Sequence, residues 1–441
     1  MKKIFVSVGI VALGAAAAHA GGDAGLATGG DNSKPWSVQA TLRGFYDDNY
    51  NTSSGSNRLD SFGVTISPSI AFRFPMDQTT LGFRYTYGAT WYEDRANLNS
   101  SNDAWDQSHE FEGILSHSFN ERFSMAASDS FVIAQEPGLL NDAGNPYRTQ
   151  GNNIRNHGEI TFNGAITRQL SFVLGYQNTY YDYKEEGSNN PIPLLRDLEN
   201  ATDPSYSGLL DRMEHEALLN LRWQALSKTV LVAGYNYRQV NYTSDEAIAL
   251  VSLADIRYAK MRDSRSHIFY GGFDQNFSKE LILTVRAGVQ MTDYYKAPAA
   301  EPNDGNTSPW GNLSLTYLYL PGSSVQAGFR YSRNQTDVVS PDAAGSITSD
   351  EESAVLFGVI NHRFTPKLSG RLTAQWQNSK FYGGSHDGKT EDFLDLGGAL
   401  TFRINQHFST EVGYNFSQLT SDLGDRDYDR SRVYLGVTAA Y

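Results

Sequence analysis

The chain has 441 residues, no cysteine and a formal net charge of −13, with 12% aromatic and 19% charged residues. The missing cysteines exclude disulfides and thiolate metal sites, and the acidic balance argues against a nucleic-acid partner, which would need a basic surface. Soluble chains usually carry about a quarter charged residues, so the composition favours a protein with one face in an apolar environment.

The first twenty residues have the pattern of a secretory signal peptide. Lys2 and Lys3 precede an apolar stretch over 4–18, and Ala18-His19-Ala20 forms a small-x-small cleavage site. We expect residues 21–35, which are rich in Gly, Asp and Ser, to form a flexible periplasmic segment. A single domain is expected over 36–441.

From Trp36 onward, apolar and polar side chains alternate in long runs. Alternation with period two predicts strands with one apolar and one polar face. The runs that we interpret as strands cover residues 36–48, 61–74, 79–92, 107–119, 123–134, 155–166, 169–183, 213–224, 229–242, 266–277, 280–294, 310–320, 323–334, 353–364, 367–380, 391–404, 407–419 and 430–441.

Short turns and long loops alternate between these strands. The short turns lie between two apolar residues, as in 119–123, 166–170, 277–281, 364–368 and 404–408, and the longer connections are rich in Asn, Asp, Gly, Ser and Pro. This rhythm is typical of an outer-membrane β-barrel. We therefore predict an all-β fold, a transmembrane antiparallel up-and-down barrel of about 18 strands.

A soluble β-sandwich also alternates, but its strands are usually shorter. Tyr and Trp also gather at the strand ends, as in an interfacial girdle. The pairs that carry this pattern are Trp91-Tyr92, Tyr180-Tyr181, Tyr294-Tyr295 and Phe381-Tyr382.

An even strand count places both chain ends in the periplasm. Strand 430–441 should pair with strand 36–48, because an open sheet edge in lipid leaves backbone groups unsatisfied. The terminal aromatic Tyr441 is the expected signal for the outer-membrane assembly machinery. The other expected partners are the lipid and lipopolysaccharide of a Gram-negative-type outer membrane.

The polar strand faces carry side chains that would line the lumen and tune its selectivity. The alternative is that Arg–carboxylate pairs only brace the wall. The predicted pore-lining residues are Arg43, Arg73, Arg84, Glu110, Glu112, Glu159, Glu216, Arg222, Arg238, Asp274, Arg286, Gln290, Arg330, Arg371, Asp395, Arg403, Glu411 and Arg432.

Two long loops, 184–212 and 243–265, contain apolar clusters that a solvated loop would not need. In the second loop the spacing is compatible with a short amphipathic helix. Either loop could fold inward and narrow the pore. The alternative is packing on the rim or against another subunit.

Four histidines, His109, His157, His215 and His267, lie near the outer ends of strands. By parity all but His157 face lipid, so we predict no metal site and no cofactor. The acidic run 422–429 lacks the Glu that closes a calcium loop, which favours a solvated loop. His215 and Glu216 have no nucleophile that the sequence singles out beside them, so we do not expect an enzyme.

The segment Phe45-Tyr46-Asp47-Asp48-Asn49-Tyr50, followed by Asp60 to Pro68, resembles the start of the β-barrel porin family associated with exopolysaccharide export loci. The resemblance implies a wide outer-membrane channel, with polysaccharide as a candidate solute. We expect a channel for polar solutes through a water-filled lumen constricted by extracellular loops. The alternative is a non-conducting structural or surface-display barrel for adhesion or envelope integrity. The sequence leaves the oligomeric state open.

Overall fold

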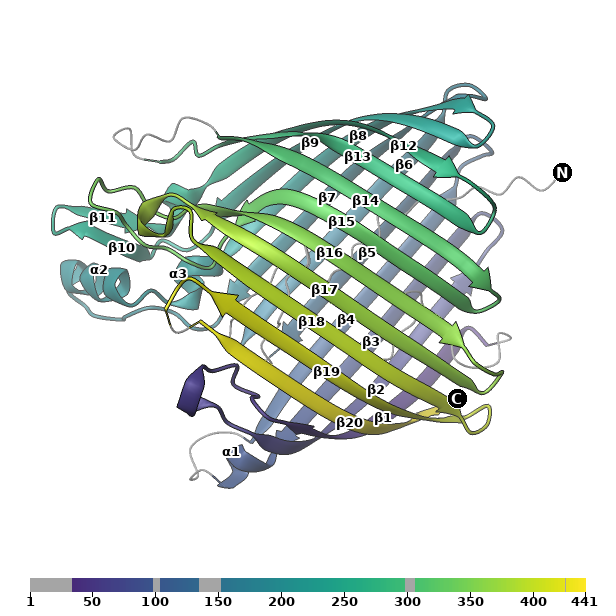
Figure 1. Cartoon of the computed structure of the whole chain (residues 1–441), viewed down its shortest axis with the longest axis horizontal. Coiled ribbons are helices and arrows are strands. Elements are labelled where there is room, and N and C mark those ends of the chain that lie inside the picture. The colour runs from purple at the N-terminus through teal and green to yellow at the C-terminus, as the bar shows by residue number, and fades with distance from the viewer. Residues whose placement is uncertain (1–33, 98–103, 135–151, 298–305, 425) are drawn as a thin grey trace.

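The computed structural model describes residues 34–97, 104–134, 152–297, 306–424 and 426–441. The expected signal peptide and most of segment 21–35 lie outside these residues. Within the described residues, eighteen strands form one closed antiparallel sheet (Figure 1), which confirms the predicted fold class.

The strands follow one another around the barrel in chain order, each paired with its neighbours in sequence. Those of the first half are β1 (Trp36–Asp47), β2 (Ser61–Pro75), β3 (Thr79–Tyr92), β4 (Trp105–Ser118), β5 (Phe123–Ala134), β6 (Asn153–Ala165), β7 (Leu170–Tyr183), β8 (Arg212–Leu226) and β9 (Thr229–Tyr242). Those of the second half are β12 (Ser264–Asn276), β13 (Leu281–Asp293), β14 (Asn306–Leu320), β15 (Ser323–Gln335), β16 (Asp350–Arg363), β17 (Leu368–Tyr382), β18 (Thr390–Arg403), β19 (Phe408–Ser421) and β20 (Tyr428–Ala440).

The barrel closes between its first and last strands, as predicted. β1 pairs antiparallel with β20 from Gln39↔Ala440 to Asp47↔Arg432. Closure satisfies the backbone groups that an open edge would expose to lipid. At the end of the barrel with the short turns, the Lys34 ammonium lies 3.8 Å from the centre of the Tyr441 ring.

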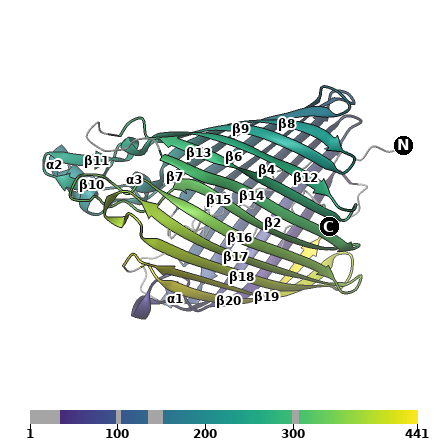
Figure 2. The same cartoon turned by 45° about the horizontal axis from the view of Figure 1, so that its top comes forward.

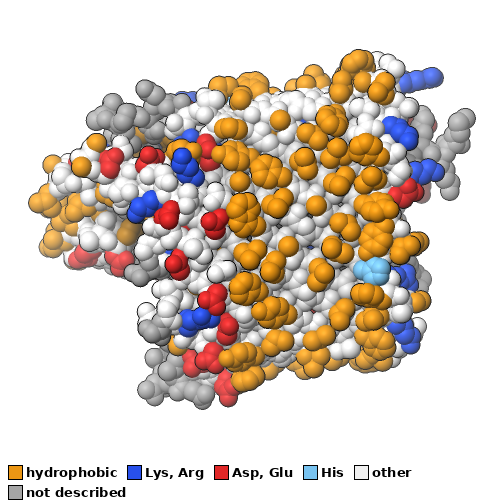
Figure 3. Space-filling view, in the orientation of Figure 1, with side chains coloured by type: hydrophobic (Ala, Val, Ile, Leu, Met, Phe, Trp, Pro, Cys, Tyr) orange, Lys and Arg blue, Asp and Glu red, His pale blue; other side chains and the backbone are white. Residues whose placement is uncertain are grey.

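The outer wall is apolar over the middle of the barrel (Figure 3). Large side chains such as Leu42, Leu356, Leu372 and Leu435 are each more than half exposed. Their neighbours along each strand point into the barrel and are mostly polar, because successive side chains alternate between faces. Exposed apolar surface on this scale is stable only against lipid.

The longer connections emerge at the end of the barrel opposite the C-terminus, where several project beyond the wall (Figures 1 and 2). They contain short elements: η1 (Gly55–Asn57), α1 (Glu93–Asn97), α2 (Pro193–Thr202), α3 (Tyr206–Leu210), β10 (Ala247–Ser252), β11 (Asp255–Tyr258), η2 (Ala259–Arg262) and η3 (Gly384–His386). None of the helices within the described ranges has the length and apolar character needed to cross a membrane.

The helix predicted in loop 243–265 is wrong. Residues 247–258 form the β10–β11 hairpin, with Ala247 paired to Tyr258 and Leu250 to Ile256. β-Branched residues such as Ile248 and Val251 favour extended backbone, and Leu253-Ala254 supply the turn. The other predicted loop contains the longer helix, α2, which has Pro193 at its first position.

Candidate pore and its extracellular mouth

All eighteen predicted pore-lining residues lie on the inward face of the barrel, because their parity is opposite to that of the exposed apolar residues of the same strand. They differ in what they contact. Those in ion pairs are Arg43, Arg84, Glu112, Arg222, Arg238, Asp274, Arg286, Glu411 and Arg432. Within the described residues, no ion pair forms at Arg73, Glu110, Glu159, Glu216, Arg330, Arg371, Asp395 or Arg403, although Glu216 accepts a hydrogen bond from Asn236 at 2.8 Å.

Several ion pairs bridge adjacent strands, or strands separated by one other strand, and brace the wall. Asp274 on β12 lies between Arg222, at 2.7 Å, and Arg286, at 2.6 Å. Arg43 on β1 reaches Glu411 on β19 at 3.0 Å, passing over Gly436, its register partner on β20. For these residues the bracing alternative describes what the structure shows.

A cluster of charged residues lies where β1 pairs with β20. Arg432 is among the predicted pore-lining residues, whereas Asp47 and Arg430 are not. Asp47 is fully buried and lies 2.6 Å from Arg430 and 2.8 Å from Arg432. Arg430 has the same parity as Arg432, so alternation alone could have found it. The same holds for Glu214, which bridges Arg212 and Arg238 at 2.8 and 2.7 Å.

Four of the charges without ion pairs lie on facing walls, whereas Arg73 on β2 and Asp395 on β18 do not follow this separation. Glu110 and Glu159 lie on β4 and β6, and Arg330 and Arg371 on β15 and β17. In the closed order of strands, β15 is nine strands from β4, and β17 is nine from β6. In a barrel of eighteen strands, nine strands is half the circumference, so acidic and basic side chains face each other across the lumen.

Aromatic residues predicted for the girdle turn inward at the mouth. Tyr92, Tyr181, Tyr294 and Phe381 are all at most 5% exposed. In each adjacent pair only one ring can face lipid, because neighbouring side chains on a strand point to opposite faces. The inward rings form an apolar lining beneath the extracellular loops.

The two long loops pack on inward-facing residues, not on the outer wall. Leu210, at the end of α3, joins a buried cluster with Tyr181 and Tyr183. Ile248 and Ala249, on β10, join another with Val240, Tyr242 and Ile347. These contacts hold both loops on the outer ends of the strands, and the narrowing of the pore by either loop stays a prediction.

Arginines tie these loops together into one unit, which we call the cap (residues 184–211, 243–263 and 336–349). Arg257 donates to the Gly345 carbonyl at 2.9 Å, and Arg262 donates to the Leu209 carbonyl at 3.0 Å and to the Thr336 carbonyl. Each bond joins separate loops, so the cap holds together through side chain–backbone contacts.

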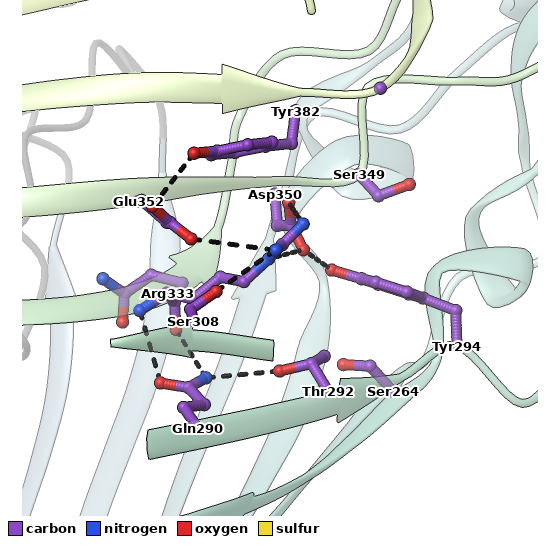
Figure 4. Close-up of polar contacts among 12 residues, drawn as sticks. Ser264, Gln290, Thr292, Tyr294, Ser308, Arg333, Ser349, Asp350, Glu352 and Tyr382 are labelled. Atoms are coloured by element: carbon purple, nitrogen blue, oxygen red, sulfur yellow. Dashed lines mark hydrogen bonds and ion pairs between the residues drawn. The ribbon is translucent and has the colours of Figure 1, made fainter. Parts of the chain in front are cut away.

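Below the cap, a buried polar cluster joins β13 to β17 (Figure 4). Arg333 makes a two-pronged contact with Asp350, at 2.6 and 2.7 Å. Tyr294 also donates to Asp350, and Tyr382 donates to Glu352 at 3.0 Å. A cavity of about 190 Å³ opens beside Arg333 and Asp350.

This cluster changes the interpretation of Gln290. Its side chain points inward as predicted but is only 2% exposed, and its amide donates to the Arg333 carbonyl at 3.0 Å. Toward the mouth, the pairing between β14 and β15 ends at Gly311↔Tyr331. Closer to the mouth than this pair, the Gln290 side chain hydrogen-bonds the backbone of β15. Gln290 is therefore a structural contact at the mouth, not an open pore-lining residue.

The histidines occupy the faces that parity predicts. On the outer wall, His109, His215 and His267 hydrogen-bond Tyr85, Tyr176 and Tyr235 at 2.9, 2.7 and 2.8 Å. His157 points inward, 2.8 Å from the Thr179 hydroxyl. Across the described part of the chain, no three His, Cys, Asp or Glu side chains are grouped so that they could hold a metal ion.

One buried carboxylate is expected to make the stability of the cap depend on pH. Asp211 follows α3 and accepts hydrogen bonds from the Ser207 hydroxyl, at 2.6 Å, and the Tyr183 amide, at 2.7 Å. Burial, reinforced by nearby Asp182 and Glu246, raises the pKa of Asp211 to about 6. The folded loop then binds a proton more tightly than the unfolded loop, so its stability falls as pH rises from about 4 to about 6.

We therefore expect the amides of 205–211 to exchange with deuterium more slowly at pH 5 than at pH 7.5, after correction for the intrinsic rates. Asp211→Asn, which cannot ionise, should remove this difference. An equal pH dependence in the variant would assign the effect to another group.

Comparison with known proteins gives one family match and several solved structures of similar trace. No curated protein matches the sequence. Residues 261–441 match the family described as "Putative beta-barrel porin 2". The predicted resemblance to a β-barrel porin family is confirmed over this part of the chain, although segments 45–50 and 60–68, which suggested it, lie outside the match. The association of the family with exopolysaccharide export stays a prediction.

Solved structures with a similar trace include two siderophore or ferric enterobactin receptors and OccAB4. The chain is 8% identical to the siderophore receptor PirA from Acinetobacter baumannii, with a TM-score of 0.43, covering 92% of this chain and 80% of that one. For OccAB4 of the same organism the identity is 11% and the TM-score 0.41, and the match covers 92% of this chain and 99% of that one. For a ferric enterobactin receptor mutant (PfeA, R480A) from Pseudomonas aeruginosa the identity is 9% and the TM-score 0.44, and the match covers 92% of this chain and 81% of that one.

Proposed function

We propose that the protein is an outer-membrane channel that passes polar solutes through a water-filled lumen, narrowed at its extracellular mouth by the cap. The observation that carries the proposal is the charge arrangement of the inner wall. Charges that only brace a wall should be paired with their neighbours, whereas Glu110 and Glu159 face Arg330 and Arg371 across the lumen.

Two further features support a wet interior. Eighteen strands enclose more space than side chains alone can fill. Arginine and carboxylate side chains without an ion pair are stable at a wall only when water solvates them. Opposed charges in such a lumen create a field that orients polar solutes and discriminates between ions.

We further propose polysaccharide as a solute, a substrate class that the family resemblance implies. An inward-facing aromatic pair supports it. Tyr270 and Trp310 lean toward each other across Gly288, with ring centres 4.6 Å apart. The Tyr270 hydroxyl donates to Asn220 at 2.7 Å, so apolar ring faces and amide groups lie together. Sugars present the same combination of apolar faces and hydroxyls.

A second function, a non-conducting structural barrel, is favoured by the contacts of the cap. Its loops are bonded to one another and packed on the inward aromatic lining, which would suit a closed mouth. A closed barrel would serve adhesion or envelope integrity. Measurements of ionic current separate the two functions, because only a channel conducts.

The test is single-channel conductance in planar bilayers with a salt gradient. The wild type should conduct, and Glu110→Gln with Glu159→Gln should shift the reversal potential toward anion selectivity. Arg330→Gln with Arg371→Gln should shift it oppositely, because the two pairs contribute opposite fields. Shifts in the same direction, or none, would contradict the facing-wall arrangement. Added oligosaccharide should interrupt the current, and Trp310→Ala should weaken the block.

A further inference from the structure

Within the described strands, one carboxylate lies on the outer wall at a depth where lipid is expected. Asp129 on β5 is exposed and has the parity of the outward residues Phe131 and Ile133. Its register partners are Gly113 on β4 and Gly158 on β6. Neither glycine has a side chain to shield the carboxylate, so Asp129 faces whatever surrounds the barrel.

Asp129 lies deep in the apolar belt, away from both membrane surfaces. It is six residues from Phe123, at the periplasmic start of β5, and five from Ala134, at its outer end. With the usual rise and tilt of barrel strands it lies about 15 Å above Phe123. Lipid headgroups do not reach that depth in a belt about 25 Å tall.

The surroundings of Asp129 are polar and hollowed. Asn156 on β6 donates to both carboxylate oxygens, at 3.0 and 3.1 Å. Tyr176 and Asn178 follow on β7, and both hydrogen-bond His215, at 2.7 and 3.2 Å. A cavity of about 300 Å³, lined by Asp129, Asn156, Gly158, Tyr176 and Asn178 among others, opens on this wall.

We propose that this wall, β4 to β8 around Asp129, is the interface with a second copy of this chain. Acyl chains offer no hydrogen bond, so a carboxylate and two amides facing lipid would be costly. Other walls present large apolar side chains, such as Leu356 on β16, Leu372 on β17 and Leu435 on β20.

The patch is complementary to itself. Two copies in one membrane share an orientation, so a two-fold axis relating them runs along the membrane normal. An axis over β6 places Asp129, on β5, opposite β7 of the other copy, which bears the hydroxyl of Tyr176 and the amide of Asn178. The carboxylate of each copy thereby lies opposite polar groups of the other, which hydrogen-bond His215 within their own chain. The small residues Gly113 and Gly158 allow close approach of the two walls.

Site-specific cross-linking tests this interface, because the chain has no cysteine of its own. Ile160→Cys places a thiol on the outer face of β6, near the proposed axis, where Ile160 is 42% exposed. Leu356→Cys is the matched control on a distant wall, where Leu356 is 53% exposed. A short bismaleimide applied to outer membranes should join I160C chains into a product of twice the chain mass and leave L356C monomeric.

Asp129 itself decides between a protein interface and a lipid-facing wall. In the I160C background, Asp129→Leu should reduce the cross-linked yield at least about tenfold, whereas Asp129→Asn, which keeps an acceptor, should retain most of it. Heat-modifiable gel migration checks that each variant is folded. An unchanged yield with D129L would overturn the proposal. So would absence of the I160C product, equal products from both cysteines, or a product whose mass shows a different protein.

Discussion

Deleting residues 246–258, most of which form the β10–β11 hairpin, is expected to raise the single-channel conductance severalfold. The hairpin packs Ile248 and Ala249 onto the inward-facing Val240 and Tyr242, and it carries Arg257, which bonds the Gly345 carbonyl. Its removal takes away both the apolar contact and one tie between loops. Because β9 and β12 remain paired with each other, the barrel itself should be preserved.

A pair of point variants provides a sharper version of this experiment. Ile248 is 1% exposed within the cap, whereas Leu253 is 74% exposed at the tip of the hairpin. Ile248→Ser should loosen the cap and increase conductance or its fluctuations, while Leu253→Ser should behave as the wild type. Unchanged conductance in the deletion would show that the hairpin does not obstruct the lumen. If neither the wild type nor the deletion variant conducts, the result would favour the non-conducting structural barrel.

Leu372→Arg is expected to destabilise the barrel by about 2–4 kcal/mol, the cost of an arginine near the midplane of the lipid-facing wall. Leu372 is 57% exposed on the outer face of β17. Its neighbour Thr373 points into the barrel, so Thr373→Arg should change the free energy of unfolding little. Urea titration followed by heat-modifiable migration measures both. Equal losses in the two variants would mean that the facing assigned to β17 is wrong.

Period-two alternation is a local property, and for that reason the strands, their facing and the closure were predictable from the sequence. Each strand is long enough for its apolar residues to identify one face, and lipid accepts only a closed sheet. The pairing of Asp47 with Arg432 follows from closure between the first and last strands. The inward facing of the eighteen predicted residues follows from parity alone.

What the tertiary structure decided concerns residues whose partners are distant in the chain. Arg426 bonds Asp337, 89 positions away, and Glu391 on β18, 35 positions away, and no local pattern links residues so far apart in the chain. The hairpin at 247–258 was expected as a helix, because the spacing of apolar residues in a short segment fits both the helical period of 3.6 and the strand period of 2. Only packing against the inner wall distinguishes the two structures.

The same physical limit explains Gln290 and Asp129. Parity gave the inward facing of Gln290, but the end of β14–β15 pairing, which buries it beneath Arg333, is a property of the folded wall. Parity likewise gives the outward facing of Asp129. Only the barrel shows that this carboxylate lies in the middle of the belt beside glycines and amides, because depth depends on how eighteen tilted strands register with one another.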